Sequence, residues 1–158
     1  MHDRHHDRNA LTRSRVQALL AERDEFRTTV LEPEVDVAFQ IAQIADVLVL
    51  DHQIEDRIIF HLLRALYRIP SETSPLLINA PSDPQQLVGY VERGFVGYIT
   101  EDDLDERLAD MVSIIAQQQV CLPPDIIPHI IERYRQLRSF LPQGLETRRN
   151  DFRQRFDE

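Results

Sequence analysis

Apolar residues along this chain switch repeatedly between short continuous runs and helical spacing. The strongest run is Asp-Val-Leu-Val-Leu-Asp at 46–51, which is typical of a parallel strand buried on both faces. Two more strands are predicted at 76–78 and 95–100, and the alternation of Phe26, Thr28 and Val30 predicts a short one before them. Helical spacing predicts helices over 9–23, 35–44, 58–67, 83–94, 102–118 and 125–141.

The alternation of strands and helices predicts an α/β fold, a three-layer, doubly wound parallel sheet covered on both sides. Such sheets carry their working residues at the carboxyl ends of the strands, which meet at one edge. Those ends hold Asp51, Asn79 and Glu101. We therefore expect a crevice formed by these three residues.

Three segments are expected: a polar N-terminal stretch at 1–8, a domain at 9–124, and a helical extension or linker at 125–158. The extension has an apolar stripe that the sheet cannot cover, because the helix at 102–118 already packs on the sheet and leaves no face for it. The stripe can fold back on the domain or pair with a second copy, and we predict a homodimer. The predicted interface residues are Ile127, Ile130, Ile131, Tyr134 and Leu137.

Composition and charge argue against several classes of function. A formal net charge of −9 argues against a nucleic-acid surface, since phosphate contacts need clustered positive charge. No run is long enough for a membrane span and no signal peptide is evident, so a cytoplasmic location is expected. No nucleophile–base motif, metal-ligand spacing or glycine-rich phosphate loop occurs, which predicts a protein that is not an enzyme and has no metal or cofactor. All 18 basic residues are Arg.

The order of elements resembles the receiver domain of response regulators, particularly those joined to helix-turn-helix output domains. The segments that carry the resemblance are the run at 46–51, Gly-Phe-Val-Gly-Tyr-Ile at 94–99 and Cys-Leu-Pro-Pro-Asp at 121–125, and it covers roughly 9–125. It implies that Asp51 stands at the phosphoacceptor position and Tyr98 at a rotameric switch position. It also implies a regulatory and dimerising module of a signalling or transcription-control protein, coupled to a partner or output domain.

Several positions depart from the family's phosphorylation site. Asn79 stands where a Ser or Thr is expected, and Glu101 stands where the family has a Lys, a residue that this chain lacks altogether. Asp7 and Arg8 align with the family's acidic pair, so a cation replaces one carboxylate. The first receiver strand is weak or missing, because residues 1–6 offer only Met1 as an apolar residue. These departures predict a receiver that works without phosphorylation.

Two alternatives remain open. One is a regulatory domain that binds a small molecule in the crevice at Asp51, Asn79 and Glu101. The other is a competent phosphoreceiver that is completed by N-terminal residues missing from this sequence. The first alternative differs from a phosphorylation-independent receiver in binding a small molecule, and the second differs from it in accepting a phosphoryl group.

Overall fold

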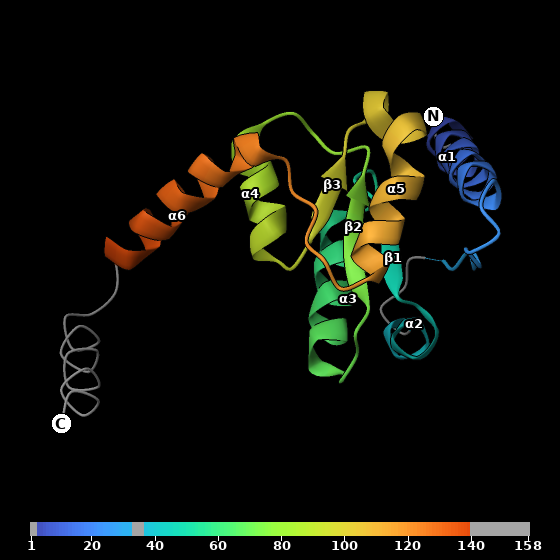
Figure 1. Ribbon diagram of the computed structural model, residues 1–158, viewed down its shortest axis with the longest axis horizontal. Coiled ribbons are helices and arrows are strands. Elements are labelled where there is room, and N and C mark those ends of the chain that lie inside the picture. The colour runs from blue at the N-terminus through green and yellow to red at the C-terminus, as the bar shows by residue number, and fades with distance from the viewer. Residues whose placement is uncertain (1–2, 33–36, 140–158) are drawn as a thin grey trace. The chain divides into compact units, whose positions relative to one another are not determined.

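A computed structural model describes residues 3–32 and 37–139, and for residues 3–10 it describes the backbone only. The chain divides into two compact units, Met1–Pro123 and Pro124–Glu158. Among the described residues, the first unit holds a small sheet and five α-helices, and the second holds helix α6 (Ile127–Ser139) after a 3₁₀ turn at Pro124–Ile126 (Figure 1). The units are described separately below.

The sheet has three parallel strands in the order β1-β2-β3. They are β1 (Val47–Asp51), β2 (Ser74–Ile78) and β3 (Gly97–Ile99), with Val49 opposite Leu76 and Leu76 opposite Gly97. Three strands following one another in parallel through helical crossovers confirm the prediction of an α/β fold with an open parallel sheet.

The helices between the strands begin and end close to start and stop signals in the sequence. Helix α3 (Asp56–Arg68) buries four residues at helical spacing and ends just before Pro70. Helix α4 (Pro84–Glu92) begins with Asp83, whose carboxylate accepts a hydrogen bond from the Gln85 N–H at 3.3 Å. Gly94, at φ 114°, adopts the left-handed backbone that reverses the chain toward β3.

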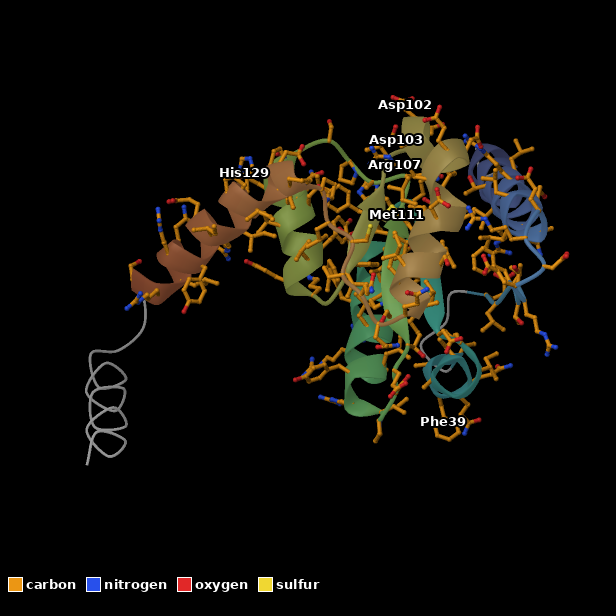
Figure 2. All side chains as sticks on the ribbon, in the orientation of Figure 1. Phe39, Asp102, Asp103, Arg107, Met111 and His129 are labelled. Carbon is orange, nitrogen blue, oxygen red and sulfur yellow. The ribbon has the colours of Figure 1, made fainter. Side chains whose placement is uncertain are left out.

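Helix α5 (Leu104–Ala116) contacts all three strands and lies across one face of the sheet (Figure 1). Figure 2 shows Met111 on the side of α5 turned toward the strands. Helix α1 (Asp3–Ala21) packs against α5 and adds Leu20 to the same core. The other buried members of this core are Leu76, Ile78, Ile99, Leu104, Leu108, Met111, Val112 and Ile115.

Ion pairs on the surface join α1, and the turn that follows it, to α5. Arg15 bonds Asp105 of α5 at 2.7 Å, and Arg23 pairs with Asp110. This geometry lowers the pKa of Asp105 through the hydrogen bond and charge of Arg15. Because both pairs are exposed, each contributes little to the stability of the fold.

The strand predicted at 26–30 is wrong, since residues 26–32 have no regular structure. Alternation alone does not make a strand, because its backbone groups need a neighbouring strand to bond to. The segment is held by side chains instead. Phe26 packs against the core, and the Glu32 carboxylate accepts two hydrogen bonds from Arg13, at 3.0 and 3.3 Å. Among the described residues, no strand precedes β1.

Two helix boundaries also differ from the predicted ones. Helix α1 begins at Asp3, six residues earlier than expected, so it includes most of the stretch taken as a separate polar segment. Helix α2 (Ala38–Ile44) is seven residues long, and the start predicted at 35 lies outside the described residues. Within the described ranges, no helix combines the length and hydropathy that a membrane span requires.

Candidate functional site

Two of the predicted crevice residues meet at the carboxyl ends of β1 and β2. The Asp51 carboxylate accepts hydrogen bonds from the Gln53 backbone N–H at 2.9 Å and from the Asn79 side-chain amide at 3.2 Å. Asn79 directly follows β2 and has a positive φ of 53°, a backbone conformation that Asn tolerates better than most residues. Both oxygens of Asp51 are therefore engaged by local neutral donors.

The Asn79 side chain has one atom without a partner. Its Oδ1 is buried, and no donor bonds it among the described residues. The hydrogen bond from the Asn79 Nδ2 to Asp51 and the backbone turn at φ 53° hold this amide in place. Asn79 is thus a fixed partner of Asp51.

Glu101 and Tyr98 lie on the β3 side. Glu101 begins the 3₁₀ turn Glu101–Asp103 after β3, where its side chain is exposed. Its charge acts on Arg15, whose pKa is raised first by the hydrogen bond to Asp105 and then by the charges of Asp105 and Glu101. Tyr98 is half-buried in the middle of β3. The predicted convergence is thus seen for Asp51 and Asn79, and Glu101 is coupled electrostatically to α1.

The other predicted positions lie elsewhere. Asp7 and Arg8 are inside helix α1 and not in a loop after a strand, because this helix begins at Asp3. The predicted interface residues belong to α6, where Ile127, Ile131, Tyr134 and Leu137 are exposed and Ile130 is partly buried.

An aromatic cluster surrounds Tyr90 of α4. The Tyr90 ring lies edge-on to His52 and Phe95, each at 5.7 Å between centroids, and its hydroxyl donates to the Asp56 carboxylate at 3.0 Å. Burial, followed by the Asp56 hydrogen bond and charge, raises the pKa of Tyr90 to about 12. The phenol therefore stays neutral near neutral pH and joins the loop after β1 to the approach into β3.

One feature that the sequence did not predict is a cavity of about 650 Å³ beside β1. Its walls come from β1, α1, α2, α5 and the irregular segment 25–32. Asp51 lines it, whereas Asn79 and Glu101 do not. The weak first strand was the one signal in the sequence that could have predicted a gap next to β1.

Among the side chains that the structure describes, in residues 11–32 and 37–139, no group of three or more His, Cys, Asp or Glu is placed to hold a metal ion. Comparison of the chain with protein-family models, with curated proteins and with solved structures found no match.

Proposed function

We propose that this protein is a receiver-like regulatory module, with a three-layer doubly wound fold, that acts through protein–protein contact and without phosphorylation. The observation that supports it is the state of Asp51. Its two carboxylate oxygens are taken up by the Gln53 N–H and the Asn79 amide, at the end of the first of three consecutive parallel strands.

Charge explains why phosphorylation of Asp51 is unfavourable. A phosphoryl group adds a charge of about −1.5 to −2 and needs cationic or strong hydrogen-bond donors to hold it. The chain has no Lys, and Asn79 supplies one neutral donor. With a net charge of −9, the chain offers little long-range compensation.

The proposed module acts by contact, and α6 offers one surface for it. Exposed Ile127, Ile131, Tyr134 and Leu137 lie at helical spacing on this helix. Soluble proteins rarely leave such a stripe uncovered, so we propose a homodimer through α6, in a cytoplasmic protein that couples to an output domain or partner and does not bind nucleic acid itself. Sedimentation equilibrium of Ile131→Glu with Tyr134→Glu should give a monomer where the unaltered chain gives a dimer. A monomeric unaltered chain would contradict this contact.

Incubation with acetyl phosphate and magnesium, followed by intact-mass measurement, tests the phosphorylation-independent mechanism. We expect no gain in mass, with Asp51→Asn as the matched control that removes the acceptor. A stoichiometric gain of one phosphoryl group that disappears in Asp51→Asn would overturn the proposal.

A further inference from the structure

The outer edge of β1 has unpaired backbone groups. The Ser74 N–H donates to the Asp46 carbonyl, and the His52 N–H donates to the Ile78 carbonyl, each at 3.0 Å. Backbone groups of successive residues in a strand point to opposite sides, so Leu48 and Leu50 face β2.

The alternate residues, Val47, Val49 and Asp51, direct their N–H and C=O groups away from β2. The Asp51 carbonyl accepts from the Ile54 N–H at 3.0 Å, in the turn that follows β1. The N–H and C=O groups of Val47 and Val49 have no backbone partner on this side among the described residues. Two pairs of donor and acceptor, on alternate residues, are therefore unpaired along this edge among the described residues.

The cavity lies along this same edge. β1 lines it over its whole length, from Val47 to Asp51, and the irregular segment 25–32 lines it as well. Val16, Phe26, Val47 and Val49 pack against the core only partly buried, so apolar side chains meet the cavity as well. Unpaired edge groups next to an apolar space are the two features that a strand needs in order to add to a sheet.

We propose that β1 binds an extended segment of a partner protein, which adds to the sheet as a further strand and fills the cavity with alternate apolar side chains. The free backbone groups repeat every second residue, as the groups of an extended peptide do, and this repeat favours a peptide over a small molecule. The cavity volume, about 650 Å³, is within the range of ligand pockets. The inference goes beyond the proposed function, because it depends on the β1 edge and not on the state of Asp51.

Selection from a phage-displayed library of random heptapeptides on the full chain tests the proposal. We expect enrichment of sequences with apolar residues at alternate positions. Ala116 of α5 lines the cavity, so Ala116→Phe should fill it and weaken the selected peptides at least about tenfold. Arg107→Phe, which adds the same ring at an exposed position of α5 outside the cavity, is the matched control and should leave the affinity unchanged.

N-methylation of the selected peptides identifies backbone pairing. Methylating the alternate peptide nitrogens that face β1 should abolish binding, whereas methylating the other set should not. Amide exchange of Val47 and Val49 should slow in the complex. Circular dichroism of Ala116→Phe verifies that the variant is folded, and the unaltered chain with N-methylated peptides provides the same test without any substitution.

Three outcomes overturn the proposal: no enrichment of alternating sequences, selected peptides that bind Ala116→Phe equally well, or equal tolerance of both N-methylated sets. A fourth is protection of Val47 and Val49 in a dimer of the chain without peptide, which would assign the edge to a second copy. The mass measurement with acetyl phosphate is unaffected by any of these results, so the two proposals fail separately.

Discussion

The two edges of the sheet differ in whether another segment of the chain pairs with them. At the β3 edge, Cys121 bridges Gly97, and its N–H donates to the Val96 carbonyl at 2.8 Å. A Cβ atom on Gly97 would lie 3.0 Å from the Cys121 carbonyl oxygen and 3.1 Å from the Met111 Cε. At the β1 edge, a cavity of about 650 Å³ takes the place of a neighbour.

This difference shows how one edge of a small sheet can be covered by the chain while the other keeps backbone groups that another strand could pair with. Exposed strand edges promote unwanted pairing, and folded proteins usually cover them. Here a single chain segment covers β3, which has three residues, while the five-residue β1 keeps its outer groups unpaired. The open edge is the longer one, as a binding edge should be.

The largest expected effect is at the closed edge. Gly97→Ala should lower the free energy of unfolding by about 1–3 kcal/mol, because the new methyl group meets backbone and two packed side chains. Denaturant unfolding measures it. Gly89→Ala in α4 is the matched control: its Cβ meets only the flexible end of Arg93, at 3.3 Å, so it should stabilise by about 0.5–1 kcal/mol. Equal effects at the two glycines would contradict tight closure at β3.

Tyr90 joins the turn after β1 to the segment that leads into β3. A substitution at Tyr90 therefore tests how much this connection stabilises the fold. Its pKa of about 12, against an ordinary 10.0, keeps the folded phenol neutral where the unfolded one ionises. The stabilisation is complete below pH 10 and is lost as the pH rises through 12. Tyr90→Phe should cost about 1 kcal/mol at neutral pH and remove the part of the alkaline loss due to this residue.

Near-ultraviolet absorbance can follow phenol ionisation in this chain, which has four Tyr and no Trp. It should show a phenol that ionises near pH 12, and this late step should be missing in Tyr90→Phe. A late step that persists in the variant would assign the raised pKa to another tyrosine.

The sequence predicted the strands and helices wherever a periodic pattern coincided with local signals. The run at 46–51 and the Asp83-Pro84 helix start are examples, and both hold in the structure. The strand at 26–30 failed because its pattern needed a partner strand that the described residues do not supply. The meeting of Asp51 and Asn79 followed from parallel topology, but the cavity depends on packing between distant segments, which periodicity cannot show.

The smallest expected effect is at the open edge. Ala116→Leu adds three carbon atoms beside the cavity, where there is space for them. We expect a change in unfolding free energy within about 0.5 kcal/mol, because burial offsets the ordering of the larger side chain. Denaturant unfolding beside Gly97→Ala gives the comparison directly. A loss as large as that of Gly97→Ala would mean that the β1 side is as tightly packed as the β3 side.

Residue-resolved amide hydrogen exchange of the free protein tests the open β1 edge most directly. Leu48 and Leu50, bonded to β2, should exchange slowly, as should Cys121, which donates to Val96. Val47 and Val49, in the same strand, should exchange at least about a hundredfold faster, because their N–H groups lack a partner. Alternation of fast and slow amides along β1 is the result that the open edge predicts, and uniform protection of Val47 to Leu50 would contradict it.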